Sequence, residues 1–449
     1  DLLGIVGLIP ALGMLVALWW AYRTGGLGGL AVGLVVSVPV GTVVSCLYLA
    51  GLRWAVLPRL RPGTYPVESM TYLRKWLSDG IMSVSRALLL PVYTTLFLPP
   101  WLRLMGAKIG PRAELSTVWS LAPELVDLGP ESFFADGSII GGRRTFGGRC
   151  QVSANRVGAR SFVGNGAILP VGHSLGDGCL LGVQSVTPAV ATQPLDQAEW
   201  LGSPAFRLAH RPKVGDFSEA QTYRPTAKLY AQRTVVDALR ILIPGYLGLA
   251  ALVGWVATLA VVSPYGVGAV LFTAPFAGLV TAVLLALVVA GLKKAVMGTF
   301  KPEIKPLWSP YVWLNEMVNG AYESVTAPFV AGLLGTPFAA PVLRLMGCKI
   351  GRRTFLATTL FSEWDLVEIG DDVALNHGVV IQNHLFEDRV FKSSRLTIGS
   401  GASVGNMTVV LYDSVIEPGA VVGPLSLLMK GETLAAKTRW LGIPTAPVS

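Results

Sequence analysis

The sequence predicts a membrane α plus all-β protein, in which a transmembrane helical hairpin followed by a parallel β-helix domain occurs twice. Three observations lead to this fold class. The 449-residue chain is 52% hydrophobic and 14% charged, against about 25% charged in ordinary soluble domains, and its mean hydropathy is +0.56. Similar segments recur at a constant distance along the chain. Within each copy, aliphatic residues recur every six positions.

Two pairs of apolar runs account for the hydropathy. The runs cover residues 2–22 and 27–52, and then 241–262 and 267–290. Each is long enough to cross the hydrocarbon core, which needs about 20 helical residues. Lys and Arg flank both pairs, whereas the short turns within the pairs carry one cation between them. By the positive-inside rule, we expect both polar domains to be cytoplasmic.

The repeat fixes the expected domain boundaries. Residues 102–110 resemble 343–351, 125–129 resemble 366–370, and 163–165 resemble 404–406, each at an offset of 241. The linker helices are expected at the membrane interface or packed under the domains. The expected order is a hairpin at 1–56, amphipathic linker helices at 57–107, a degenerate β-helix at 108–212, a linker at 213–240, a hairpin at 241–297, linker helices at 298–348 and a β-helix at 349–449.

The six-residue period indicates a parallel β-helix of triangular section, because each step supplies one flat side and one corner. The aliphatic residue points into the prism, and small residues such as Gly turn the corner. The first copy has in-phase positions at Leu128, Phe134, Ile140, Phe146 and Val152, then Val157, Val163, Leu169, Leu175 and Leu181. The second copy has Ile369, Leu375 and Ile381, then Ile398, Val404, Val410, Ile416, Val422 and Leu428.

These repeats resemble the left-handed β-helix acyltransferases, whose coils often end in a Gly-x-Pro-Ala step similar to residues 202–205 and 442–445. The alternation of hairpins and β-helices is more specific. It resembles the C-terminal region of membrane-bound nonribosomal peptide synthetases of the ε-poly-lysine synthetase type. The resemblance implies a multi-pass protein of the bacterial inner membrane, with adenylation and carrier domains and a third β-helix unit upstream. Since Asp1 leads directly into an apolar run, we expect the chain to be part of a longer protein.

The stretch from Asn383 to Lys392 is the expected catalytic region. The six-residue phase is interrupted after Ile381 and resumes at Ile398, so the charged residues between them are predicted to form a loop that leaves the coil. His384 can act as a base near neutral pH, and Glu387 or Asp388 could orient its ring. In related acyltransferases an Asn-His step before such a loop supplies the general base, which implies this role for His384 after Asn383.

Further polar residues complete the expected site. Arg389 and Lys392 could hold the phosphate of a phosphopantetheine arm. Glu363 and Asp365, just before the coil, could bind a substrate amine, or else be solvated. His377 is expected at a corner or in a supporting position.

The first copy lacks the candidate catalytic groups. At the offset of 241, Asn383, His384, Glu387 and Asp388 correspond to Gly142, Arg143, Phe146 and Gly147. We therefore expect the first domain to keep the fold without the acid–base chemistry. Since the related acyltransferases work as trimers, the tandem units suggest a trimer built into one chain, with the two prisms side by side.

The resemblance thus implies the condensation region of such a synthetase, an acyltransferase that joins carrier-bound amino acids to an amine by iterative amide bond formation. The donor would be an aminoacyl thioester on the 4′-phosphopantetheine of an upstream carrier domain. One alternative is a membrane-bound acyltransferase that uses acyl-CoA, and another is a non-catalytic scaffold that tethers the upstream domains. Neither a zinc site nor a disulfide framework is indicated by the four cysteines, and the basic clusters lack the interleaved aromatics of a nucleic-acid surface.

Overall fold

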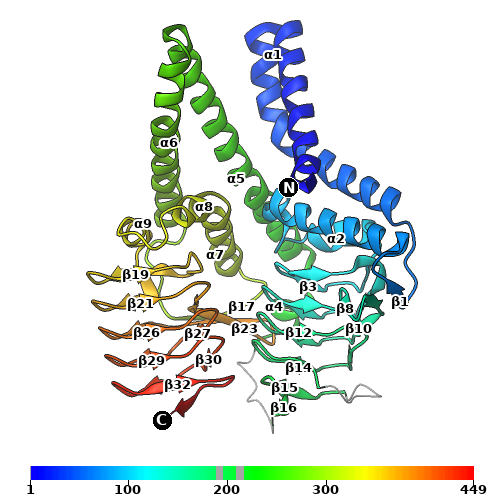
Figure 1. The fold of residues 1–449 in the computed structure, drawn as a ribbon, viewed down its shortest axis with the longest axis vertical. Coiled ribbons are helices and arrows are strands. Elements are labelled where there is room, and N and C mark those ends of the chain that lie inside the picture. Colours follow the sequence, from blue (N-terminus) through cyan, green and yellow to red (C-terminus); the bar gives the residue numbers. More distant parts are fainter. Residues whose placement is uncertain (1, 189–195, 209–216, 449) are drawn as a thin grey trace. The chain divides into compact units, whose positions relative to one another are not determined.

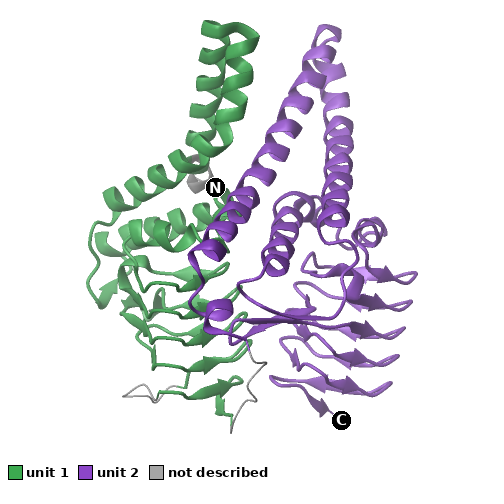
Figure 2. Ribbon diagram, turned by 180° about the vertical axis from the view of Figure 1, so that it is seen from behind, with its two compact units in different colours: residues 1–211 green, residues 212–449 purple. Residues whose placement is uncertain are grey.

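The computed structural model describes residues 2–188, 196–208 and 217–448 (Figure 1). The chain forms two compact units, Asp1–Arg211 and Pro212–Ser449 (Figure 2). Each unit contains long apolar helices, a set of short helices, and a coil of parallel β-strands. The boundary between the units lies at the end of the first predicted repeat.

The apolar helices of the first unit form a hairpin. Helix α1 (Leu2–Val56) is interrupted at Gly26, whose φ of 56° and ψ of −145° are not helical. A Cβ on Gly33 would lie 3.1 Å from the side chain of Leu18, so the two halves of α1 pack closely. This break falls in the turn that the sequence predicts.

The second unit has a helical pair whose first member is longer than predicted. Helix α5 (Ala227–Val262) meets α6 (Val267–Val296) through a 3-10 turn, η3 (Ser263–Tyr265). The expected linker at 213–240 therefore contains α4 (Glu219–Thr222) and the first turns of α5. These turns bury Asp237 and Arg240, and Arg240 Nη1 lies 2.8 Å from Glu316 Oε2. In the described residues, three helical stretches are long and apolar enough to cross a membrane: Val6–Val56, Glu219–Tyr265 and Val267–Val296.

Short helices connect each apolar pair to its coil. In the second unit, α7 (Pro310–Ala321) buries Val312, Trp313 and Val318, so it packs against protein. The short helices of the first unit are α2 (Met70–Leu88), η1 (Leu90–Val92), α3 (Leu98–Leu104) and η2 (Pro123–Leu125). Those of the second are α7 (Pro310–Ala321), the π-helical η4 (Tyr322–Thr326), α8 (Ala327–Ala331), α9 (Ala339–Met346) and η5 (Trp364–Leu366).

The second coil is a three-sided prism, because consecutive strands fall in turn into three parallel sheets. Stacked residues such as Thr397, Val415 and Thr433 are 18 positions apart. One sheet contains β18 (Lys349–Ile350), β20 (Val367–Ile369), β25 (Leu396–Ile398), β28 (Val415–Ile416) and β31 (Thr433–Leu434). The next contains β19 (Phe355–Leu356), β21 (Ala374–Leu375), β26 (Ser403–Val404), β29 (Val421–Val422), β32 (Arg439–Leu441) and the antiparallel β33 (Ala446–Val448). The third contains β22 (Val380–Gln382), β27 (Val409–Leu411) and β30 (Leu427–Leu428).

The first coil has the same three-sheet arrangement. One sheet contains β2 (Lys108–Ile109), β5 (Val126–Leu128), β10 (Asn155–Val157) and β13 (Ser174–Leu175). The second contains β3 (Glu114–Leu115), β6 (Phe133–Phe134), β11 (Phe162–Val163), β14 (Leu180–Leu181), β15 (Glu199–Leu201) and the antiparallel β16 (Phe206–Arg207). The third contains β4 (Ser120–Leu121), β7 (Ile139–Ile140) and β12 (Ile168–Leu169).

The six-residue period identifies the cores of the prisms correctly, with two exceptions. All nine in-phase residues of the second copy are at most 3% exposed. The corner glycines are required by close stacking, since a Cβ on Gly399 would lie 2.6 Å from the backbone nitrogen of Pro418. In the first copy, however, Phe146 is 49% exposed. It belongs to a hairpin outside the coil, and so does Val152, which is buried in a cluster with Leu57 and Leu60. The agreement of both residues with the period is therefore fortuitous.

A β-hairpin leaves each coil at the same place, between the third sheet and the first. In the second unit it consists of β23 (His384–Glu387) and β24 (Val390–Ser393), and β24 pairs with β17 (Glu303–Pro306). In the first unit, β8 (Arg144–Phe146) and β9 (Arg149–Val152) form the hairpin, and β9 pairs with β1 (Gly63–Pro66). The predicted loop is thus a hairpin fixed by a strand that follows the apolar helices.

Candidate functional site

His384 lies at the base of the hairpin, where β23 leaves the coil. The preceding residue, Asn383, is fully buried, and its Nδ2 donates to the carbonyl oxygens of Leu366 (3.3 Å) and Ser394 (3.2 Å). The bond to Leu366 connects the hairpin base to the turn η5. His384 is therefore held beside the residues that precede this turn.

The partner of His384 is Glu363. The Nδ1 atom of His384 lies 2.7 Å from Glu363 Oε2, with the histidine side chain 18% exposed and the carboxylate fully buried. A carboxylate beside Nδ1 fixes the hydrogen on that nitrogen, so Nε2 keeps its lone pair. This is the arrangement of a general base with its orienting carboxylate.

Helix α7 holds the other side of Glu363. Asn315 Nδ2 donates to Glu363 Oε1 at 2.8 Å, and Asn319 Nδ2 approaches the same atom at 3.4 Å. Burial alone would raise the pKa of Glu363, but the charge of His384 and the hydrogen bonds from His384, Asn315 and Ser362 outweigh it, so the pKa lies below its usual range. Glu363 is therefore an ionised carboxylate at neutral pH.

The backbone at Glu363 is strained. Its φ of 39° and ψ of 53° lie in the left-handed region, which a side chain of this kind rarely adopts. Such a conformation costs about 1–3 kcal/mol and persists where surrounding contacts enforce it. Here the fully buried Trp364 and the bond from Leu366 N to Glu363 O (2.8 Å) supply those contacts.

Aromatic rings surround the histidine. The Phe391 ring stacks on His384 with a centroid distance of 4.8 Å and an interplanar angle of 27°. The Phe386 ring meets His384 edge-on at 5.9 Å, and Tyr311 of α7 meets Phe391 at 5.9 Å. These contacts restrict the orientation of the imidazole and surround it with apolar surface.

The structure corrects the expected partner of His384. Side chains alternate between the two faces of a strand, so Glu387, three residues after His384, lies on the opposite face of the hairpin. There it binds Lys392 (2.7 Å) and Lys430. Asp388 lies in the turn beyond Glu387, with φ 49°, so it is separated from the histidine by the length of the strand.

The remaining predicted residues are dispersed. Arg389 is 1% exposed, its guanidinium lies 4.9 Å from the centre of the Tyr223 ring, and it donates to Thr222 O. Asp365 binds Lys293 at the end of α6 and accepts from Phe300 N at 2.9 Å. His377 is exposed at a corner of the coil. Of the predicted set, the structure brings together His384, Asn383 and Glu363.

The first unit has an ion-pair network at the equivalent positions. Arg143, at the position of His384, lies 3.0 Å from Asp79 of α2. Lys75 binds Asp79 (2.7 Å) and lies 3.6 Å from Glu124, which also binds Arg53 (3.2 Å).

Three further positions of the site have changed with Arg143. Helices α2 and α7 can be aligned on the residues that precede them, Ser69 and Ser309. In this alignment Lys75 corresponds to Asn315, and Asp79 corresponds to Asn319. Ala122 takes the place of Glu363 at the offset of 241. In contrast, Asp365 keeps a carboxylate counterpart in Glu124. The first copy thus lacks both Glu363 and His384, whereas it keeps a carboxylate at the position of Asp365. This shared absence is the sequence signal that could have identified Glu363 as the partner of His384.

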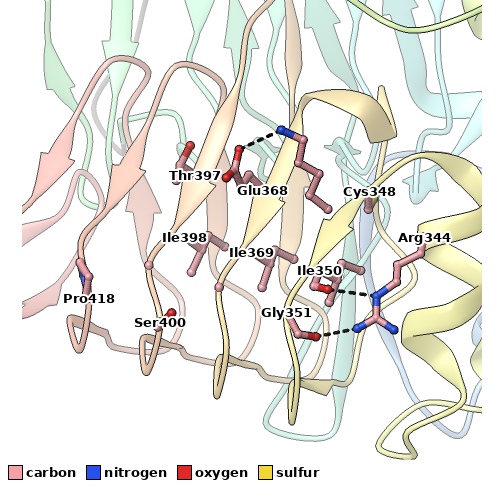
Figure 3. A pocket seen from close by; sticks show the side chains of 13 residues that line it. Arg344, Cys348, Ile350, Gly351, Glu368, Ile369, Thr397, Ile398, Ser400 and Pro418 are labelled. Carbon is pink, nitrogen blue, oxygen red and sulfur yellow. Dashed lines mark hydrogen bonds and ion pairs between the residues drawn. The ribbon is translucent and has the colours of Figure 1, made fainter.

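A separate depression lies on the side of the second coil (Figure 3). It has a volume of about 640 Å³ and is lined by residues of β18, β20 and β25, among them Lys349, Glu368 and Thr397. Arg344 closes one end by donating to the carbonyl oxygens of Ile350 (3.0 Å) and Gly351 (2.6 Å). Its lining includes none of the predicted site residues.

Comparisons with known proteins give one extended relationship. The chain is 36% identical over 420 residues to the delta-poly-L-ornithine synthetase of Acinetobacter baumannii (strain AB307-0294), an alignment that covers 92% of the chain. The chain spans 31% of the length of that protein. No protein-family model matches the sequence.

Solved structures with some likeness include two acetyltransferases. A maltose O-acetyltransferase from Clostridium difficile 630 is 15% identical with a TM-score of 0.22, over 27% of this chain and 80% of that one. Soybean serine acetyltransferase complexed with serine is 16% identical with a TM-score of 0.22, over 48% and 76%.

Proposed function

We propose that the second coil carries the amide-forming acyltransferase site of a membrane-bound nonribosomal peptide synthetase, with His384 as its general base. The observation that carries the proposal is the 2.7 Å contact between His384 Nδ1 and the buried Glu363 carboxylate. The relationship to a poly-L-ornithine synthetase supports a product built from a basic amino acid. The donor would be an aminoacyl thioester on the 4′-phosphopantetheine of a carrier domain upstream.

The chemistry requires a base at this position. A side-chain amine has a pKa of about 10.4, so it arrives protonated and cannot attack until it loses a proton. The ammonium first releases one proton to solvent, and Nε2 of His384 then takes a second proton from the nitrogen as the C–N bond forms with the thioester carbonyl. The C–S bond then breaks, and the imidazolium returns the proton to the departing sulfur. The ionised Glu363 stabilises the imidazolium between these two transfers.

The membrane arrangement belongs to the same proposal. Both coils would lie in the cytoplasm of a bacterial cell, beneath helical hairpins that cross the inner membrane, and would wind in the left-handed sense. The first coil would serve as a non-catalytic partner. Its Arg143–Asp79 pair supports this assignment, because a guanidinium remains protonated and cannot act as a base near neutral pH.

Replacement of the histidine tests the proposal. We expect His384→Gln to lower the rate of amide formation by about 10²–10⁴-fold, the usual contribution of a general base. Glutamine retains an N–H for Glu363, so the buried carboxylate keeps a donor and the fold is preserved. The measurement is product formation by the purified full-length protein in detergent, with thermal unfolding recorded for each variant.

Two variants serve as controls. His173→Gln removes a histidine of the first unit, whose Nδ1 lies 2.8 Å from Thr187 Oγ1, and should leave the rate within about twofold. Arg143→Ala should cost far less than the change at His384. A near-normal rate for a folded His384→Gln protein would show that the proposed mechanism is wrong.

A further inference from the structure

One face of the hairpin sheet gathers the catalytic histidine and a second carboxylate. In the register of the sheet, Glu303 of β17 is opposite Ser393 of β24, and Ser393 is opposite His384 of β23. Directly paired residues of antiparallel strands point to the same face. Glu303 and His384 therefore project from one row, with their backbones two strand spacings, or about 10 Å, apart.

The next row on this face is aromatic. Lys305 pairs with Phe391, and Phe391 pairs with Phe386. The rings of Phe391 and Phe386 both contact His384, as described above, which confirms that the two rows share one face. Thus two aromatic rings lie next to the row that carries Glu303 and His384: Phe391 is fully buried, and Phe386 is half-buried.

Helix α7 covers this face through residues four positions apart. Asn315 and Asn319 hold Glu363, and Tyr311 is one turn earlier on the same stripe. The Tyr311 ring contacts Phe391, and its hydroxyl is buried without a hydrogen-bond partner among the described residues. Burial first, and then the charges of Glu363 and Glu303, raise the pKa of Tyr311. The hydroxyl is therefore a neutral polar group that lies near two carboxylates.

The chain places an ammonium group of its own at this position. Lys305 Nζ lies 3.1 Å from Glu303 Oε2 and 5.9 Å from the centroid of the Tyr311 ring. A carboxylate and an aromatic face together are the features that bind an alkylammonium ion. Both side chains of this ion pair are about one third exposed, at 39% and 32%, so a soluble ammonium can compete with Lys305.

We propose that Glu303 and Tyr311 form a subsite for the second ammonium group of a diamine acceptor whose other amine is presented to His384. The ligand class is a basic amino acid, or the end of its polymer, with two amines separated by a short alkyl chain. This inference rests on the proposed function, because the ligand of the subsite is the acceptor of the proposed acyl transfer. Glu303 selects an acceptor that carries a second positive charge, and the half-buried Phe386 ring contacts the methylene groups between the two nitrogens.

Equilibrium binding to the purified full-length protein tests the subsite without any acyl donor. The ligands are cadaverine, which has two ammonium groups, and pentylamine, which has one on the same carbon chain. We expect the wild-type protein to bind cadaverine at least about tenfold more tightly than pentylamine. Glu303→Gln and Tyr311→Phe should reduce this preference, while Lys305→Met should tighten cadaverine binding because it removes the competing ammonium.

Glu368→Gln is the matched control, since it changes an exposed carboxylate on the side of the coil and should leave the preference intact. If Glu303→Gln retains the cadaverine preference while its melting temperature is unchanged, the subsite is refuted. Equal binding of the two ligands by the wild-type protein refutes it as well.

Acyl-transfer assays separate this result from the proposed function. If amide formation depends on His384 but the acceptor KM does not respond to Glu303→Gln, the function stands and the subsite fails. If Glu303 governs cadaverine binding but amide formation is insensitive to His384→Gln, the subsite stands and the assignment of the base fails.

Discussion

At the scale of single residues, the site depends on a buried carboxylate that is 21 positions away from its histidine in the sequence. The sequence identified His384 and placed Glu363 among the candidates for substrate binding. It favoured Glu387 and Asp388 as partners because they are close in sequence. Alternation along β23 places Glu387 on the other face, whereas η5 brings Glu363 to within 2.7 Å. Only the hairpin, which the hydrophobic period does not encode, decides between these carboxylates.

Glu363→Gln distinguishes orientation of the base from binding of a substrate amine. A glutamine amide can donate to Nδ1 and shift the ring hydrogen to Nε2, which removes the acceptor. We therefore expect kcat to fall by about 10²-fold or more, with the KM for the amine unchanged. The measurement is steady-state amide formation at varied amine concentration. A raised KM with normal kcat would instead favour the role in amine binding that the sequence suggested.

At the scale of elements, the six-residue hydrophobic period predicts only the features that every turn of the coil repeats. It identifies the inward residues of both prisms, because every coil repeats the same packing requirement. It does not reveal β17, α7 or the hairpin, since each occurs once per unit. The exposed Phe146 shows how a residue of such an insertion can match the period by chance. The contacts of the proposed catalytic site come from these non-periodic elements, so they were the part of the site that the sequence predicted least well.

Replacement of Arg389 tests whether its buried side chain stabilises the hairpin. The sequence suggested a phosphate-binding role, but the side chain is buried against Tyr223 and donates to Thr222 O. We expect Arg389→Met to lower the free energy of unfolding by about 2–3 kcal/mol, from the lost hydrogen bond and cation–π contact. The KM for the thioester donor should not change in the folded fraction. Normal stability with a raised donor KM would restore the phosphate role.

At the scale of the whole chain, the repeat predicts two units, and the structure divides at Arg211. A cation near the end of each apolar pair binds a carboxylate before the second turn of the coil: Arg53 with Glu124, and Lys293 with Asp365. These ion pairs fix each helical pair to its own coil. The side-by-side packing of the two prisms stays a prediction, because it depends on contacts between units that the repeat pattern does not encode.

Topology can be measured at the tip of the second helical pair. Gly266, between η3 and α6, should face the outside if both coils are cytoplasmic. We expect Gly266→Cys to react with a membrane-impermeant maleimide in intact cells. Glu368→Cys, on the exposed side of the coil, should react only after the membrane is permeabilised. The reverse pattern would contradict the predicted topology.

The ion-pair network of the first unit has a consequence for how the two copies diverged after duplication. Four positions differ together: Arg143, Ala122, Lys75 and Asp79 replace His384, Glu363, Asn315 and Asn319. A histidine at position 143 alone would leave Asp79 without its guanidinium partner, and no carboxylate would orient the ring, since Ala122 stands in the place of Glu363. Acid–base chemistry of the kind proposed for the second copy would therefore return to the first only through several substitutions together.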